Sequence, residues 1–559
     1  MPTINLGKLR FIFRGDYDGA TTYDALDVVR HNSNVYACLV DATVGVEPPT
    51  SGDSTEWSLM VEGAGVVTTQ GDMLYHDGTN VTRLPKGMSG EVLSSDADGN
   101  PAWTTPQGRP GTTVKALMGS GPRSYSRATL MTDGTVMLCG YSNNYSMSSV
   151  TNNHSYAPRP LCVSGSPAPK TPFKKVRMAG RSGFALSEDG EVWSWGYNGY
   201  GQLGHGDTVN RAAAERIEYF ATNNITIVDI AVPDNFYWDY GWVLFVTDLG
   251  HVYACGHNST GQCGDGTTTN KNTPGRVGTL SGITKIMCGM ANQGTAIALD
   301  ETTGELWGWG NNGDGQLGLG DTTTRTIAAQ IMASGVIDFK IMGGSQTTVQ
   351  HHWLVVLNST GQLLTCGFND YGQLGNGNTT AQSSLGVVAS DVTHWNAGDG
   401  HYGFMICRDN TGQWRGTGYN GYGQLGLGDN TDRAGFVPIA GLSGFTPKDL
   451  SSFYLDGDMS YGSSFIVRDD DTLWCCGNNT HGRLGLGHTT AANPTWQQLG
   501  TITPDMKVID MEIGGHYSSP MTRLLLSDGR VLAAGYNGHG SLGVQPDLYS
   551  IDGFQPVRF

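Results

Sequence analysis

The chain has 559 residues, a formal net charge of −17 and only 15% charged residues. An acidic surface repels phosphate backbones and anionic membranes, and no run of about 20 apolar residues could span a bilayer. We therefore expect neither nucleic-acid binding nor membrane insertion. Glycine is the outstanding component, with 82 residues, and long apolar runs with a helical period are rare, so the composition favours an all-β fold.

Residues 1–62 predict a small β module that anchors the chain. Its aromatic residues Tyr23, Tyr36 and Trp57 stand in an order that resembles the small modules related to chitin-binding domains, although Leu26 and Ser33 replace glycines of that pattern. In carbohydrate binders such aromatics stack on sugar faces. In a module of this size they also suffice to form the core, which is the interpretation we favour over a sugar site.

Residues 63–111 have short strands and too few apolar residues to fold as a separate globule. The stretch GDMLYHDGTNVTRLPKGMSGEVLSSDADGNPAW resembles a segment common in bacteriophage fibre proteins. That resemblance implies a stalk that becomes stable by intertwining with copies of itself, typically as a homotrimer. We therefore expect a short fibre-like stalk between the small module and the remainder of the chain.

Residues 112–559 contain eight similar units of 51 to 60 residues. Each unit has two short apolar runs, a tight Asp-Gly or Thr-Gly turn and a third strand such as 191–196. A repeat of this length built from short strands predicts the blades of a β-propeller. The units align on the glycine that ends the third strand: Gly140, Gly196, Gly256, Gly310, Gly367, Gly418, Gly477 and Gly535.

A glycine-rich corner follows that strand, written GYNGYGQLG both from Gly196 and from Gly418. The glycines supply left-handed backbone, the asparagine can bond to turn amides and the leucine anchors the loop. Acidic residues recur a few positions later, but Asn378 and His488 occupy the same place in other units. The position therefore predicts an Asx turn rather than a catalytic or calcium-binding carboxylate, at Asp207, Asp321 and Asp429.

These corners resemble the RCC1-type β-propeller repeat, whose signature is a hydrophobic residue and a glycine, an asparagine, and then GQLG. The family usually has seven blades, so the eight units leave seven or eight blades open. Known members include a guanine nucleotide exchange factor that docks on chromatin. An acidic chain without a basic tail does not support that role, and a propeller by itself hosts many functions.

Four cysteines stand immediately before the aligned glycine, where other units have Trp195 and Trp309. A position that accepts either residue predicts a buried thiol rather than a disulfide or a metal ligand. The chain lacks a GxSxG elbow, an HExxH motif and a Walker-type loop. We expect no enzyme activity, cofactor or metal. The four cysteines are Cys139, Cys255, Cys366 and Cys476.

The turn between the first and second strands of each unit is rich in aromatic and histidine residues. If the blades are equivalent, these residues lie on one face, where they suit stacking on sugars or an aromatic protein interface. The alternative is that single Tyr or His residues bond within their blade. The candidate receptor or glycan site comprises Phe236, Tyr237, Trp238, Tyr240, Trp242, His351, His352, Tyr402 and Tyr517.

Together these features predict a phage virion structural protein, a tail or head fibre whose propeller attaches to a glycan or protein of the host surface. Its partners would be other virion proteins, and it would lie on the virion surface after assembly in the host cytoplasm. One alternative is a capsid decoration protein that reads no receptor. A second alternative, of a different class, is a cellular propeller that acts as an interaction scaffold.

Overall fold

The computed structural model divides into two compact units, Met1–Gln107 and Gly108–Phe559, which are taken separately below. The structure describes residues 12–16, 27–31, 34–38, 57–61, 73–76, 81–84, 92–95, 101–104, 113–118, 126–142, 153–163, 169–233, 241–289, 293–345, 350–398, 402–448, 453–456, 462–503, 505–514, 520–538, 540, 542–544 and 550–557.

The first unit contains one four-stranded sheet and two hairpins. In the sheet, β1 (Ile12–Asp16) runs parallel to β2 (Asp27–His31), which pairs with β3 (Asn34–Cys38), and β3 pairs with β4 (Trp57–Val61). The hairpins pair β5 (Met73–His76) with β6 (Val81–Leu84), and β7 (Val92–Ser95) with β8 (Pro101–Thr104). The division of this unit at residue 62 stays a prediction.

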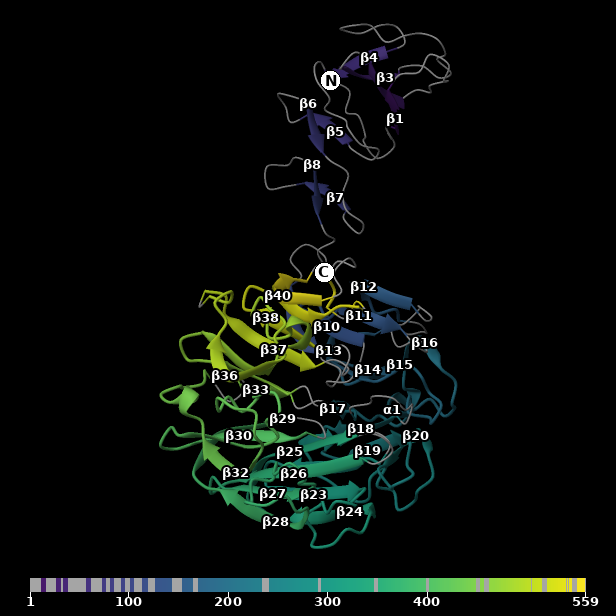
Figure 1. The fold of residues 1–559 in the computed structure, drawn as a ribbon. Coiled ribbons are helices and arrows are strands. Elements are labelled where there is room, and N and C mark those ends of the chain that lie inside the picture. Colours follow the sequence, from purple (N-terminus) through teal and green to yellow (C-terminus); the bar gives the residue numbers. More distant parts are fainter. Residues whose placement is uncertain are drawn as a thin grey trace. The chain divides into compact units, whose positions relative to one another are not determined.

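The second unit is a propeller of eight four-stranded sheets, which follow one another around the ring in Figure 1. Blade 1 is β9 (Val114–Met118), β10 (Ser126–Met131), β11 (Val136–Ser142) and β12 (Asn153–Pro160); blade 2 is β13 (Phe173–Ala179), β14 (Ser182–Ser187), β15 (Val192–Gly196) and β16 (Arg211–Arg216). Blade 3 is β17 (Ile227–Ala231), β18 (Trp242–Thr247), β19 (Val252–Gly256) and β20 (Lys271–Arg276); blade 4 is β21 (Lys285–Cys288), β22 (Thr295–Asp300), β23 (Glu305–Gly310) and β24 (Arg325–Met332). Blade 5 is β25 (Val336–Ser345), β26 (Gln350–Asn358), β27 (Leu363–Gly367) and β28 (Gln382–Ala389); blade 6 is β29 (Val392–Gly398), β30 (Phe404–Asp409), β31 (Trp414–Gly418) and β32 (Arg433–Pro438). Blade 7 is β33 (Phe453–Asp456), β34 (Ser463–Val467), β35 (Leu473–Asn478) and β36 (Ala492–Gln498); blade 8 is β37 (Val508–Gly514), β38 (Met521–Leu526), β39 (Val531–Tyr536) and β40 (Ser550–Pro556).

The fourth strand of each blade is a feature that the repeat pattern does not predict. It forms the outer edge of the sheet, where its exposure alternates, while middle strands such as β14 and β15 are buried throughout. Prolines are tolerated at this edge because no further strand needs their missing N–H, as with Pro274 in β20 and Pro494 in β36. The eight sheets settle the number of blades at eight.

Helices are scarce in the part of the chain that the structure describes. The α-helix α1 (Glu218–Thr222) connects blades 2 and 3, and the short 3₁₀ helices η2 (Ala440–Leu442) and η4 (Thr480–Gly482) lie in connections. Among these residues, no helix is long and apolar enough to cross a membrane. The all-β fold expected from the composition is confirmed.

The core consists of clusters between consecutive blades, because each sheet is radial and presents one face to each neighbour. Between blades 3 and 4, for example, Leu244 and Val252 of one sheet pack with Ile286 and Trp309 of the next. Seven equivalent clusters fill the other junctions, including the junction of the last blade with the first. Burying these side chains is the main force that stacks the blades.

Blade 8 packs against blade 1 and closes the ring, as the neighbouring yellow and blue strands in Figure 1 show. The Leu117 N–H donates to Asp510 Oδ2 at 3.1 Å across this junction. Beside it Arg127 and Arg523 each contact Glu512 at 3.2 Å, and all three side chains are almost fully buried. Every blade is built from one continuous segment, so side-chain packing and hydrogen bonds hold the closure.

Candidate functional site

Where the structure describes them, two loops of a blade meet at the same end of the sheet, and together they form what we call the corner face. One loop joins the first and second strands, and the other is the glycine-rich corner between the third and fourth strands. Backbone bonds tie them together: the Tyr197 N–H donates to Arg181 O at 3.0 Å, and the Tyr419 N–H donates to Gly403 O at 3.0 Å. Aromatic residues of both loops are therefore brought to one face.

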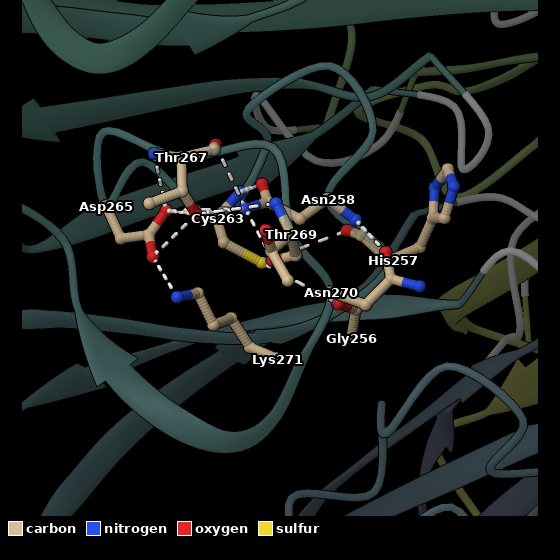
Figure 2. Close-up of polar contacts among 9 residues, drawn as sticks. All are labelled: Gly256, His257, Asn258, Cys263, Asp265, Thr267, Thr269, Asn270 and Lys271. Atoms are coloured by element: carbon tan, nitrogen blue, oxygen red, sulfur yellow. Dashed lines mark hydrogen bonds and ion pairs between the residues drawn. The ribbon is translucent and has the colours of Figure 1, made fainter.

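In the described corners the asparagine acts as a clamp, shown for blade 3 in Figure 2. Asn258 Oδ1 accepts from Cys263 N–H at 2.8 Å, while its Nδ2 donates to the carbonyls of Thr267 and Thr269 at 3.1 and 3.0 Å. Asn258 is fully buried, so these bonds satisfy backbone groups that would otherwise lack partners. The predicted role of the asparagine is confirmed, and Asn198, Asn312, Asn369, Asn420 and Asn479 form equivalent bonds.

The acidic residues beyond the corner form Asx turns, as predicted. Asp321 Oδ1 accepts from Thr323 N–H at 2.8 Å, and its other oxygen pairs with Arg325 at 2.7 Å. These contacts lower the pKa of Asp321 to about 2. Within the described residues, no group of three or more His, Cys, Asp or Glu side chains is placed to hold a metal ion.

The residue before the aligned glycine is buried, as predicted, and it is also a hydrogen-bond donor to the previous blade. Cys255 Sγ donates to Gln202 O at 3.4 Å, and Trp309 Nε1 donates to Gln262 O at 2.9 Å. Burial raises the pKa of the Cys255 thiol well above its ordinary value, so it keeps its proton. Cys139, Cys366 and Cys476 are buried thiols at the same position.

Glycine is required at the corner because the next blade lies against it. Gly372 has a φ of +75°, and a Cβ added there would lie 2.3 Å from Ala434 Cα in β32 of the following blade. A side chain would therefore collide with backbone. The corners are therefore closely packed parts of the junctions between blades.

At three junctions on this face, the same two corner positions bring aromatic or histidine rings of neighbouring blades into contact. The fourth residue after the aligned glycine of one blade packs on the first residue after that glycine in the next blade. Tyr200 meets His257 with ring centroids 5.0 Å apart, and His481 meets Tyr536 at 5.1 Å. Burial lowers the pKa of His481, which favours its neutral form.

Among the described residues, the largest aromatic group on the face joins blades 5 and 6, and we call it the tyrosine cluster: Tyr371, Tyr402 and Tyr419. Tyr402 lies 4.8 Å from Tyr371 and 4.6 Å from Tyr419, measured between ring centroids, and the other two are 5.4 Å apart. All three side chains are half-buried. Each ring packs against the other two, and part of each side chain faces solvent.

The phenols of Tyr371 and Tyr419 stay protonated at neutral pH. Desolvation, together with the neighbouring Tyr402 and Asp370, raises the pKa of Tyr371. Desolvation, with Tyr422, Asp432 and Tyr402, raises the pKa of Tyr419 to about 12. The cluster therefore offers neutral aromatic faces and hydroxyl groups next to carboxylates.

A second group lies beside the cluster and is anchored from blade 4. His351 stacks on Phe368 with ring centroids 4.0 Å apart, and its Nδ1 lies 3.3 Å from Asp314 Oδ1. Asp314 Oδ2 also accepts from the His352 N–H at 3.0 Å. Asp314 thus holds the first turn of blade 5 in place.

The structure places some predicted site residues on the corner face and buries others. Tyr402 and His351 lie on the corner face, half-buried, in the two groups just described. Trp242 and His352 are fully buried, which corrects their assignment to an exposed surface. A Cβ on Gly294 of the next blade would lie 2.7 Å from the Trp242 indole, and His352 packs equally closely on Gly343 of its own blade.

The remaining predicted residues cannot be assigned to the face. Phe236, Tyr237, Trp238, Tyr240, Tyr517 and Tyr23 lie outside the described residues. Tyr36 and Trp57 belong to β3 and β4, and their place in a sugar site or a core stays a prediction. Tyr371 and Tyr419 are functional candidates that the sequence reasoning missed, although aromatic residues at the first and fourth corner positions were a readable signal.

Comparisons with known proteins identify the repeat. The model of the Regulator of chromosome condensation (RCC1) repeat matches residues 189–236, 250–291, 303–335 and 360–404. The Ultraviolet-B receptor UVR8 of Arabidopsis thaliana is 28% identical over 315 residues, which cover 55% of this chain and 66% of that protein. The E3 ubiquitin-protein ligase HERC2 of Homo sapiens is 29% identical over 261 residues, which cover 45% of this chain and 5% of that protein.

Among solved structures, Prp20p from Saccharomyces cerevisiae matches with a TM-score of 0.47 and 19% identity, over 69% of this chain and 91% of that one. Human WBSCR16 matches with a TM-score of 0.45 and 18% identity, over 66% of this chain and 94% of that one. The chain spans less than two thirds of the length of the curated relatives named above.

These relatives correct the predicted function. They are proteins of plant and animal cells, so the assignment to a phage fibre that attaches to a host surface is wrong. The predicted virion partners, fibre-like homotrimer, host receptor and virion-surface location are corrected with it, as is the capsid decoration alternative. Over residues 63–111, whose residue pattern carried the resemblance to phage fibres, the structure describes two local hairpins, β5–β6 and β7–β8.

The matched repeats lie within blades 2 to 6, and the remaining blades share their four-stranded form. The chain contains RCC1 repeats and folds as an all-β, eight-bladed, RCC1-like propeller.

Proposed function

We propose that the protein is a cellular interaction scaffold, whose propeller docks partner proteins on the corner face without chemical turnover. The observation that carries the proposal is the tyrosine cluster, in which rings from blades 5 and 6 contact one another and remain half-buried. Tyrosine supplies a large contact area with little conformational entropy to lose, and it is enriched in the energetic centres of protein interfaces.

The rigidity of the face supports this role. Corner loops are clamped by buried asparagines and locked against the next blade at glycines such as Gly372. A surface that is already ordered loses little entropy on binding, so more of the contact energy becomes affinity. The Asp314–His351–Phe368 group extends the same surface toward blade 4.

A retention experiment with the full chain tests the proposal. The immobilised protein is incubated with an extract of the cells that make it, and retained proteins are compared between the wild type and Tyr402→Ser. The matched control is Tyr219→Ser, because Tyr219 is also half-buried but lies in α1, at the opposite end of blade 2. The Ile217 N–H bonds to Val192 O there, beside the Asp189-Gly190 turn.

We expect a set of proteins that the wild type and Tyr219→Ser retain and that Tyr402→Ser loses. Equal retention by all three proteins, with circular dichroism showing that each is folded, would overturn the assignment of the corner face as the docking surface.

A further inference from the structure

We propose that the tyrosine cluster and the carboxylates beside it bind an arginine-bearing segment of a partner protein. This inference rests on the proposed function and specifies the chemistry of the partner. Carboxylates border the rings, the nearby arginines are paired with other carboxylates, and an aromatic face attracts a cation.

Three carboxylates border the aromatic surface. Asp370 is exposed and precedes Tyr371 in the corner of blade 5. Asp432 is exposed in the corner of blade 6, where its Oδ1 accepts from the Asn420 N–H at 2.7 Å. Asp314 lies under the stacked His351. All three come from corners, so their negative charges gather on the same face as the rings.

The nearby arginines on this face are already paired. Arg325 contacts Asp321 at 2.7 Å in blade 4, and Arg433 contacts Asp429 at 2.6 Å in blade 6. Among the described residues, neither Asp370 nor Asp432 takes part in an ion pair. Arg433 favours the charged form of Asp432, but its guanidinium is paired with Asp429, so the carboxylates of Asp370 and Asp432 are open to a further cationic group.

The phenol rings add a directional attraction for the same kind of group. A tyrosine face carries negative potential and attracts a cation placed within about 6 Å of its centre. The pKa of Tyr419 is raised to about 12, so the ring is neutral and its hydroxyl stays a donor at physiological pH. A carboxylate next to a ring then favours a planar cation that can stack and bond at once.

Arginine fits this combination better than lysine does. Its guanidinium is planar, it stacks on aromatic rings and it bonds a carboxylate with two parallel N–H groups, while lysine is a compact and strongly hydrated charge. The net charge of −17 also draws a basic segment toward the propeller from a distance.

Peptide binding to the full chain provides the test. The probe is a fluorescent Gly-Arg repeat peptide, and its companions carry lysine or uncharged citrulline in place of arginine. Anisotropy titrations use the wild type, Tyr402→Leu, Tyr402→Phe and Asp370→Asn. Glu301→Gln is the matched control, since Glu301 is exposed in the turn between β22 and β23, at the end of blade 4 away from the corners.

We expect the arginine peptide to bind the wild type about tenfold more tightly than the citrulline peptide, with lysine in between. Tyr402→Leu and Asp370→Asn should each weaken binding severalfold, while Tyr402→Phe, which keeps the ring, and Glu301→Gln should bind like the wild type.

Equal binding of the citrulline peptide would overturn the inference, and so would equal weakening by Glu301→Gln and Asp370→Asn, which would indicate nonspecific attraction. A different result would contradict the proposed scaffold function. It fails if Tyr402→Ser retains every natural partner, and it survives if those partners are lost by Tyr402→Ser but remain bound to Asp370→Asn.

Discussion

The junction between blades 3 and 4 is filled by aliphatic and aromatic side chains, whereas the junction between blades 8 and 1 holds two arginines and a glutamate among its apolar residues. Val243, the blade 3 residue equivalent to Arg127, pairs with Cys255 as Arg127 pairs with Cys139. Leu244 likewise corresponds to Arg523. Charged groups thus occupy positions that are hydrophobic in blade 3.

The difference follows from chain connectivity. Blades 3 and 4 are consecutive in the chain, so the short connection between β20 and β21 limits how far one sheet can slide against the other. Blades 8 and 1 come from opposite ends of the propeller segment: Arg523 Nη2 donates to Thr129 Oγ1 across 394 positions. We infer that the ion pairs of Glu512 with Arg127 and Arg523 fix the position of blade 8 relative to blade 1. An apolar cluster tolerates small displacements of one sheet against the other, whereas a buried ion pair does not.

The largest effect should come from breaking the network at its centre. Glu512→Gln leaves Arg127 and Arg523 buried without their shared carboxylate, and we expect a loss of about 3–5 kcal/mol in the free energy of unfolding. Scanning calorimetry of the full chain measures it. A triple variant that replaces Arg127, Glu512 and Arg523 by Met, Leu and Met should regain much of the loss; a triple variant as unstable as Glu512→Gln would contradict this account.

An apolar truncation at the other junction gives the matching measurement. Leu244→Ala, in the blade 3–4 cluster, should cost about 3 kcal/mol because it leaves a cavity in a packed interior. The same calorimetry applies, with limited proteolysis as a second measurement. Glu512→Gln should expose cleavage sites near residues 113–118 before others, whereas Leu244→Ala should not. Identical digestion patterns would argue that the two junctions open together.

A smaller difference in stability should distinguish two corners that have a glutamine at the equivalent position, Gln316 in blade 4 and Gln373 in blade 5. In blade 4, Gln316 Nε2 donates to Thr295 Oγ1 at 3.1 Å. In blade 5, Trp353 occupies the position of Thr295, and Gln373 Nε2 is buried with no hydrogen-bond partner among the described residues. Gln316→Leu should therefore cost about 1 kcal/mol more than Gln373→Leu, as measured by denaturant unfolding. Equal costs would show that the bond to Thr295 contributes nothing measurable.

The smallest effect concerns pH and has opposite signs at the corners and at the closing junction. Contacts with Arg325 and Thr323 lower the pKa of Asp321 from 3.8 to about 2, so its contribution is present above pH 3.8 and is lost as the pH falls toward 2. Burial raises the pKa of Asp510, so that group favours the fold at low pH and loses this contribution as the pH rises through its folded pKa.

Melting temperatures measured from pH 5 to pH 2 check both signs. Asp321→Asn should be less stable than the wild type at pH 5 and equal to it near pH 2. Asp510→Asn, which keeps an acceptor for the Leu117 N–H, should lose stability relative to the wild type on going to acid. The same pH profile for both variants would contradict the contrast.

Local chemistry explains what the sequence could predict of the fold. Alternating short runs, Asp-Gly turns and the Asn and Gly of each corner act within a few residues, so the strands, the buried Asn258 clamp and the Asx turn at Asp321 were readable. The position that alternates between Cys255 and Trp309 was readable as buried, because both residues are apolar. Its role as a donor to the previous corner was not, because the acceptor belongs to another blade.

The candidate site was only partly predictable for the same reason. Tyr402 and His351 were identified from their place in a turn, and they do lie on the corner face. Trp242 and His352 had the same signal, yet both are fully buried: the Trp242 indole lies against Gly294 of the next blade, and the His352 ring lies against Gly343 of its own blade and Gly289 of the previous one. The functional prediction depended on the resemblance of residues 63–111 to phage fibre segments, and the relatives of the propeller contradict it.

The sequence by itself thus determined the repeat, the turns and the residue types at each corner, because these follow from backbone preferences and hydrophobic patterns over a few positions. Only the tertiary structure decided that Tyr371, Tyr402 and Tyr419 touch and that Arg127, Glu512 and Arg523 meet across the closure. Such contacts depend on how one radial sheet is placed against the next, and that placement is fixed only when all eight blades close the ring.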